Sequence, residues 1–243
     1  MACRMLRDGC ETIKGMPRTD EALDDILRSL AAQGRAGLHE TGLDGRVSLD
    51  SRAAAVATRP LPPLPASAAT SVHRVKVSLR GARPSVWRRL EVPSDLPLSV
   101  LHEVIQTAFG WFDCHLHRFE TACGDFGDPA QDDFWSVRAD ESTATLVQVA
   151  DGEKATVGYV YDFGDDWRHD LVVEAIVPAV PGVRYPRCLA SRGVPPEENS
   201  GGIASFNSRP ADTASGPADT AESLTAQLAG LAGVVVPAAT PGR

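Results

Sequence analysis

The sequence predicts an α+β fold: a β-grasp-like mixed sheet with one main packed helix, flanked by a mostly unstructured N-terminal segment and C-terminal tail. Three observations predict it. Apolar and polar residues alternate over residues 72–79, which indicates a half-buried strand. Helical spacing of apolar residues follows at 98–108. Residues 171–177 are almost wholly apolar, which is typical of a buried central strand, and Pro178 stops it.

The first strands form a hairpin. Its turn is Gly81-Ala82-Arg83-Pro84, and the second strand continues through Val86, Leu90 and Val92. A helix then presents Leu98, Leu101, Ile105 and Ala108 on one face and ends at Gly110. A hairpin followed by a helix is the opening of a β-grasp, in which the helix packs diagonally across the sheet.

The residue pattern in the middle of the chain predicts shorter strands and a loop. Residues 115–120 indicate a third strand with His115 and His117 on one face, because alternate side chains share a face. An acidic loop follows at 124–133. Further short strands are expected at 145–149 and 156–162.

The ends of the chain differ in composition from its centre. We expect residues 1–70 to be an accessory segment, with one short helix after Thr19 and the Pro-rich linker 59–65. The main domain spans 71–206. Residues 207–243 are expected to be a low-complexity tail with a Pro-Ala-Asp-Thr-Ala repeat, in which 224–236 forms a weak helix or a loose tail.

Composition and charge narrow the function classes. The chain has 24 Lys and Arg against 32 Asp and Glu, and its net charge of -8 disfavours nucleic-acid binding through the overall field. Five cysteines without a Cys-x-x-Cys pair indicate reduced thiols. We expect a cytoplasmic protein without a membrane partner, because neither a signal peptide nor a membrane-length apolar run is present.

Several separate motifs carry a family resemblance, in order along residues 72–204. They are Val86-Trp87-Arg88-Arg89-Leu90-Glu91-Val92-Pro93, Leu101-His102-Glu103-Val104-Ile105-Gln106, Gly110-Trp111, His115-Leu116-His117, Tyr161-Asp162-Phe163-Gly164-Asp165-Asp166-Trp167, Tyr185-Pro186-Arg187-Cys188-Leu189-Ala190 and Pro195-Pro196-Glu197. The chain resembles the plasmid pRiA4b ORF-3-like family. The resemblance implies a compact α+β domain with a β-grasp-like core. It also implies that the protein belongs to a group of which some members are encoded on plasmids and transposable elements. It implies no reaction.

The resemblance also marks residues expected to be structural signatures. They are Trp111, Tyr161, Gly164, Asp166, Trp167, His169 and Cys188. The chain departs from the family pattern at Val194, where members commonly carry a cysteine. It departs again after residue 206, where the repeat replaces an aromatic-rich, acidic helical tail.

The first candidate chemistry is a divalent metal site. A His-x-His pair can hold one ion when a third ligand comes from another strand. The candidate ligands are His115, His117, Asp162 and Asp165, and nearby cysteines and acids could supply further ligands. Histidines that are exposed or hydrogen-bonded within the domain are the more common alternative.

The turn at 161–167 has its own structural interpretation. Gly164 is expected to supply a positive φ, and Asp165 and Asp166 are expected to accept backbone N–H bonds. Tyr161, Phe163 and Trp167 would then be packing anchors.

The third candidate is a basic hairpin. Six basic residues and no acid lie between His73 and Leu90, and Trp87 is available for stacking on a base. The candidate nucleic-acid contacts are Arg74, Lys76, Arg80, Arg83, Trp87, Arg88 and Arg89. Residues 124–170 hold twelve acids against three basic residues, so the two halves of the domain can instead complement each other electrostatically.

Two functional hypotheses follow. The first is a non-catalytic binding or accessory module of a plasmid- or transposon-associated protein, with a protein or nucleic-acid partner, because no phosphate-binding loop, nucleophile elbow or His-Glu-x-x-His motif is present. The alternative is a metal-dependent, hydrolytic enzyme. It requires His115 and His117 to lie beside the Asp162–Asp166 turn.

Overall fold

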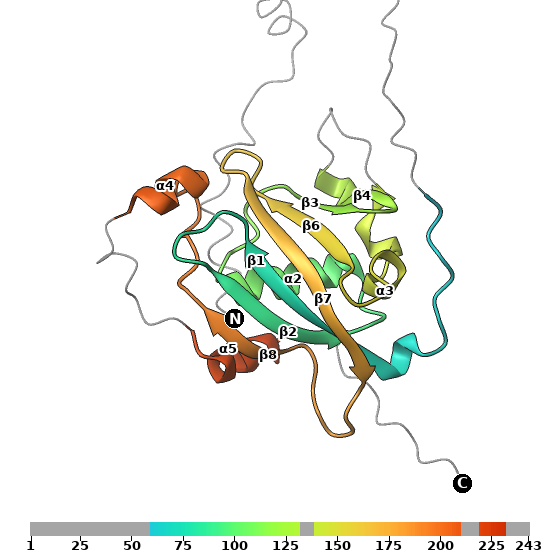
Figure 1. The fold of residues 1–243 in the computed structure, drawn as a ribbon. Helices are drawn as coiled ribbons and strands as arrows, with labels where there is room; N and C mark the ends of the chain where they lie inside the picture. Colours follow the sequence, from blue (N-terminus) through green and yellow to red (C-terminus); the bar gives the residue numbers. More distant parts are fainter. Residues whose placement is uncertain (1–58, 132–138, 210–218, 232–243) are drawn as a thin grey trace, which may run out of the picture. The chain divides into compact units, whose positions relative to one another are not determined.

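The computed structural model describes residues 59–131, 139–209 and 219–231, all of which belong to one unit. Their strands form one eight-stranded sheet in the order β5-β4-β3-β6-β7-β1-β2-β8 (Figure 1). Neighbouring strands are antiparallel, except for the parallel pair β4 and β5. The strands are β1 Ser71–Leu79, β2 Trp87–Pro93, β3 His117–Thr121, β4 Gly124–Gly127, β5 Ala139–Asp140, β6 Thr156–Tyr161, β7 Trp167–Pro178 and β8 Arg187–Arg192.

Helices and 3₁₀ turns connect these strands. The α-helices are α2 Leu98–Phe109, α3 Leu146–Val149, α4 Gly202–Ser208 and α5 Ala221–Leu228. The 3₁₀ turns are η3 Ala68–Thr70, η4 Pro129–Gln131 and η5 Glu141–Thr143. The mixed α+β class is therefore confirmed. The β-grasp assignment stays a prediction.

The opening hairpin and its helix form as predicted. β1 and β2 pair antiparallel, and α2 follows and ends at Gly110, which adopts the left-handed conformation at φ 69°. Glycine suits this position because it has no Cβ to clash. α2 lies across one face of the sheet, behind β1 and β7 in Figure 1, and buries Leu98, Leu101 and Ile105 in the core.

The central strand is β7, as the apolar run predicts. It begins earlier than that run, at Trp167, and its buried residues alternate: Trp167, His169, Leu171 and Val173. The intervening side chains are half-buried. One face of this strand therefore packs on the core and the other faces the side of the sheet opposite α2.

The prediction of a strand at 145–149 is wrong. These residues form the short helix α3, which begins with a capping box: the Thr145 side chain bonds the Gln148 backbone and the Gln148 side chain bonds the Thr145 backbone. A capping box satisfies N–H groups that a strand would direct to a neighbour, so local hydrogen bonding decides the conformation here.

The tail prediction is also corrected in part. α5 lies within the segment assigned to a low-complexity tail, yet Leu224 and Leu228 are fully buried in the core cluster. Thr225 exchanges hydrogen bonds with both backbone groups of Cys188 on the edge strand β8. The predicted N-terminal helix after Thr19 lies outside the described residues.

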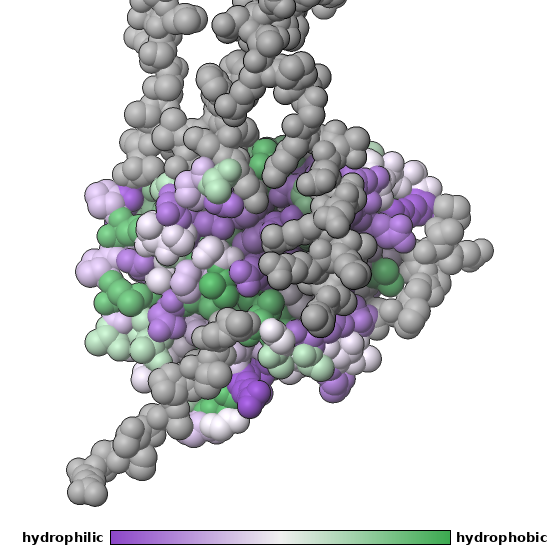
Figure 2. All heavy atoms as spheres, turned by 180° about the vertical axis from the view of Figure 1, so that it is seen from behind, coloured by the Kyte–Doolittle hydropathy of each residue, from purple (hydrophilic) through white to green (hydrophobic). Residues whose placement is uncertain are grey.

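Figure 2 shows the molecule from behind, where hydrophilic and hydrophobic residues are interspersed over the coloured surface. Among the described residues, no helix has the length and apolar character needed to cross a membrane. Cys123 and Cys188, which lie within the described ranges, are free thiols.

Candidate metal centre

The 161–167 turn holds Asp162 by hydrogen bonds within the turn itself. The Asp162 carboxylate accepts hydrogen bonds from the backbone N–H groups of Gly164, at 3.0 Å, and Asp165, at 3.3 Å. Asp162 and Asp166 adopt positive φ values of 55° and 54°, whereas Gly164 does not. The prediction for Gly164 is wrong because aspartate, with its short polar side chain, also tolerates the left-handed region.

Aromatic residues pack beneath this turn, as expected for structural signatures. Trp111 stacks on Tyr161 with ring centroids 4.9 Å apart, and Trp167 lies 6.4 Å from Trp111. His169 is fully buried against Phe109 and Trp111, and burial lowers its pKa to about 4.

The predicted packing anchor Phe163 and the signature residues Asp166 and Cys188 have separate environments. Phe163 is half-buried, with the Arg118 guanidinium over its ring. The Asp166 carboxylate accepts a hydrogen bond from Arg168 at 2.9 Å. Cys188 lies on β8, where burial raises the pKa of its thiol.

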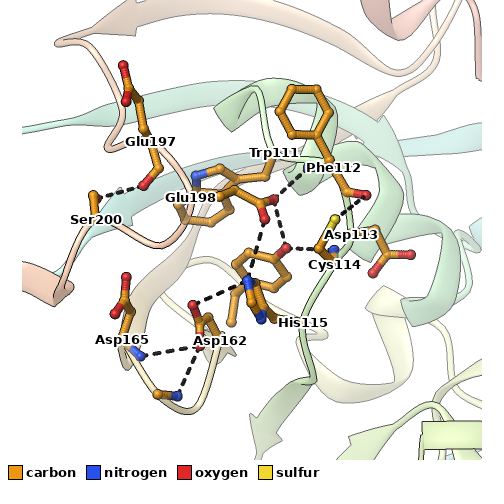
Figure 3. Close-up of polar contacts among 12 residues, drawn as sticks. Trp111, Phe112, Asp113, Cys114, His115, Asp162, Asp165, Glu197, Glu198 and Ser200 are labelled. Atoms are coloured by element: carbon orange, nitrogen blue, oxygen red, sulfur yellow. Dashed lines mark hydrogen bonds and ion pairs between the residues drawn. The ribbon is translucent and has the colours of Figure 1, made fainter. Parts of the chain in front are cut away.

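His115 lies between two carboxylates beside the turn (Figure 3). Its Nε2 is 3.6 Å from both Asp162 Oδ2 and Glu198 Oε2. Glu198 Oε1 accepts hydrogen bonds from the Phe112 backbone at 2.7 Å and from the Tyr161 hydroxyl at 2.8 Å. Burial and the neighbouring Glu198 both raise the pKa of Tyr161.

Asp165 joins the turn to the same C-terminal loop. Its carboxylate accepts a hydrogen bond from the Gly201 backbone at 2.9 Å. The acids around His115 therefore hold three chain segments together: residues 112–115, the turn, and the loop at 198–201.

His117 lies in a different environment from His115. β3 begins at His117, two residues later than predicted, and its side chain is 2% exposed. Its Nε2 lies 2.8 Å from Glu141 Oε2, and its ring stacks on His102 with centroids 3.5 Å apart and planes 9° from parallel. The predicted set therefore divides: His115 meets Asp162, while His117 meets residues that were not candidates.

The new cluster consists of His102, Asp113 and His117. Each offers a ligand atom within 4.8 Å of the others, and the part of the chain that the structure describes holds no other such group. Two ligand atoms on one ion lie at most about 4.2 Å apart, since each bond is about 2.1 Å, so a small inward shift brings all three into range. The stacked rings cannot both direct a lone pair at one ion until one of them turns.

The cluster opens onto a cleft of about 370 Å³. His102 and His117 lie at its base, 5% and 2% exposed, whereas the Asp113 side chain is 51% exposed. The described residues that line the cleft are Ser99, His102, Glu103, Asp113, His117, Asp128, Pro129, Asp140, Glu141 and Ser142.

A buried hydrogen-bond chain positions two of the three ligands. The Asp113 backbone N–H donates to Gln106 Oε1 at 2.9 Å, which turns the amide nitrogen toward the Tyr159 hydroxyl at 3.0 Å. That hydroxyl lies 2.8 Å from His102 Nδ1, and His102 Nε2 lies 3.0 Å from Asp113 Oδ1. Burial raises the pKa of Tyr159, so its hydroxyl stays neutral.

Sequence reasoning missed His102 because it lies within a helix that was interpreted only as a packing element. A signal was present. Residue 102 follows Leu98 by four positions and precedes Ile105 by three, so a histidine interrupts the apolar stripe that faces the sheet. Asp113, in the loop after α2, and Glu141, at the start of η5, had no comparable local signal.

The predicted nucleic-acid contacts are mostly engaged within the domain. Arg74 and Arg187 both bond Glu91, Arg89 forms two hydrogen bonds to Glu174, and Arg80 pairs with Asp170. The two pairs with Glu91 join neighbouring strands, whereas Arg89 on β2 reaches across β1 to Glu174 on β7. The arrangement favours electrostatic complementarity within the domain.

Four further members of that set differ in exposure. Arg88 is fully buried and donates to the carbonyl oxygens of Ala108, Trp87, Arg192 and Gly193, so it is not accessible to a phosphate. Trp87 is half-buried, with the Lys76 ammonium 5.2 Å from its ring centroid. The Arg83 backbone N–H donates to Asn207.

Residues 71–230 match the family model described as plasmid pRiA4b ORF-3-like protein. The chain belongs to this family. It is 40% identical over 134 residues to the uncharacterized protein y4hQ of Sinorhizobium fredii (strain NBRC 101917 / NGR234), covering 54% of this chain and 68% of that protein. It also resembles the crystal structure of a protein of unknown function, MM3350 from Methanosarcina mazei Go1. That similarity has a TM-score of 0.52 and 32% identity, and it covers 56% of this chain and 78% of that one.

Proposed function

We propose that the domain binds one divalent transition-metal ion through His102, Asp113 and His117, and that this ion supports its molecular function. The observation that carries the proposal is the convergence of two buried imidazoles and a carboxylate within 4.8 Å, at the base of an open cleft. Imidazole ligands favour zinc, cobalt and similar ions over magnesium and calcium, which prefer oxygen.

Three protein ligands leave coordination positions for water, which is the arrangement of catalytic rather than structural metal sites. A bound ion would lower the pKa of such a water and make it a nucleophile, the chemistry of a metal-dependent hydrolase. The protein would orient His102 through Tyr159 and Gln106, because outer-shell hydrogen bonds fix the direction of a ligating ring.

The test is calorimetric titration of the metal-free protein with Zn²⁺, Co²⁺ and Mn²⁺. We expect one ion per chain, and we expect Asp113→Asn to weaken its affinity by about a hundredfold, because it replaces a charged ligand. Asp151→Asn is the matched control, since Asp151 is exposed and does not line the cleft. A protein without stoichiometric metal, or equal affinity loss in both variants, would overturn the proposal.

A second candidate is a non-catalytic accessory module of a plasmid- or transposon-associated cytoplasmic protein, acting on a protein or nucleic-acid partner. The observation that favours it is the position of Lys76 over Trp87. A cation beside an aromatic ring can bind single-stranded nucleic acid, because the cation contacts the phosphate backbone and the ring stacks on a base. A gel shift with single-stranded DNA and RNA tests this at low and high salt. Binding lost in Lys76→Ala supports it, and no shift at low salt counts against a nucleic-acid partner.

A further inference from the structure

The described residues that line the cleft carry one sign of charge. Among its described residues are five carboxylates, Glu103, Asp113, Asp128, Asp140 and Glu141, and neither lysine nor arginine. Acids alone are common on a protein surface. Here they surround two imidazoles that are almost fully buried and that converge with Asp113, so the cleft has both a metal-ligand cluster and an excess of negative charge.

Two of these acids are engaged with the histidines. Asp113 is a ligand in the proposed centre and contacts His102, and Glu141, whose side chain is 6% exposed, contacts His117. A divalent ion beside the Asp113 carboxylate leaves roughly one positive charge at the centre when both imidazoles are neutral.

The remaining three acids, Glu103, Asp128 and Asp140, have no ion pair with any basic residue that the structure describes. Asp128 accepts a hydrogen bond from the Ala130 N–H, and Asp140 accepts one from the Ser142 N–H, each through Oδ1. Hydrogen bonds from Ser142 lower the pKa of Asp140 and keep it ionised. Among the described residues, these three negative charges therefore exceed the positive charge that a bound ion brings.

We infer that the cleft takes ligands with a positively charged group, a guanidinium or an ammonium, which lies beside the metal centre against Glu103, Asp128 and Asp140. The inference rests on the proposed function, because the metal would hold the other end of the ligand. Like-charge repulsion disfavours anionic groups such as phosphate esters at this site.

The probes are chosen to isolate charge. Nα-acetyl-argininamide carries a guanidinium, and Nα-acetyl-citrullinamide carries a neutral urea of nearly the same shape. Neither terminal group coordinates metals as a free amine does. Three carboxylates at about 6–8 Å in a water-exposed cleft favour the cation by about tenfold, and this preference falls with added salt.

The zinc-loaded full chain is titrated with both probes and with inorganic phosphate. Binding is measured from the changes in the chemical shifts of His102 and His117. We expect the arginine probe to bind about ten times more tightly than the citrulline probe. We expect the variant Glu103→Gln/Asp128→Asn/Asp140→Asn to lose that preference while it still binds zinc. Asn at 128 and 140 can still cap through its carbonyl oxygen, so the loops remain folded.

Asp151→Asn/Glu153→Gln serves as the control, because both acids are exposed and neither lines the cleft. Equal binding of the two probes, tighter binding of phosphate, or an unchanged preference in the triple variant would overturn the inference while zinc binding stands. A chain that binds no zinc would overturn the proposed function and the inference together.

Discussion

Two acid-rich regions of this domain use the same residue types differently. In the 161–167 turn, the carboxylates of Asp162 and Asp165 accept backbone N–H bonds, and that of Asp166 accepts a hydrogen bond from the Arg168 side chain. In the cleft, Glu103, Asp128 and Asp140 have no ion pair with a described basic residue, and Asp128 and Asp140 cap the backbone N–H groups of Ala130 and Ser142. A high local number of acidic residues therefore does not distinguish a ligand-binding cleft from a structural turn.

The distinguishing feature is what each carboxylate contacts. A carboxylate that accepts two backbone N–H bonds fixes the chain, so its removal costs stability. A carboxylate beside a buried imidazole and open solvent keeps its charge available. The predictions below separate the two regions, from the largest expected effect to the smallest.

Trp167→Ala is expected to lower the free energy of unfolding by about 3–5 kcal/mol, because it removes a fully buried aromatic side chain from beneath the turn. Chemical denaturation measures the loss. Phe112→Ala is the control: Phe112 is 71% exposed, so its removal should cost less than about 0.5 kcal/mol. Comparable losses in both variants would contradict the structural role of the turn.

Acid should destabilise the domain through His169, whose folded pKa of about 4 lies below its usual value of 6.5. The unfolded chain binds this proton more readily, so stability is complete above about pH 6.5 and falls as the pH drops toward 4, by about 3 kcal/mol in total. His73, whose pKa burial also lowers, acts in the same direction. His169→Phe should flatten the curve of stability against pH. An unchanged slope would refute the assignment.

Asp162→Ala is expected to lower the free energy of unfolding by about 1–3 kcal/mol, because it leaves two backbone N–H groups of the turn without their acceptor. Asp162→Asn should cost much less, since asparagine can accept the same bonds and tolerates the positive φ. Metal affinity should be unchanged in both. Loss of metal binding in Asp162→Asn would show that the turn, rather than the cleft, holds the metal.

Glu103→Gln should change the free energy of unfolding by less than about 0.5 kcal/mol, because Glu103 is exposed and contributes repulsion rather than a structural contact. Thermal denaturation measures this change and compares it with the larger loss of stability expected for Asp162→Ala. A large loss would mean that the cleft acids, like those of the turn, are structural.

Local pattern was sufficient for the hairpin, for α2 and its Gly110 terminus, and for β7, since each has a period or a terminator in its own residues. It failed at 145–149, where an apolar run is compatible with either conformation and a reciprocal cap selects the helix. It also failed for α5, whose burial depends on docking against β8 and α2 rather than on its own composition.

The site was predictable only in part. His117 was a candidate, and its position on β3 is local information. Its partners come from α2, from the loop after Gly110 and from η5, so only the packing of the helix on the sheet brings them together. The His-x-His spacing was misleading because β3 begins at His117, so His115 lies outside the strand and faces different neighbours.

Those two histidines provide the most direct test of the metal centre. Cobalt absorbance titrations of His117→Ala and His115→Ala compare residues two positions apart, one in the cleft and one beside the turn. Removing one ligand of three should weaken cobalt affinity by about a hundredfold in His117→Ala and leave it near the wild-type value in His115→Ala. Retained cobalt binding in His117→Ala, with loss in His115→Ala, would contradict the account.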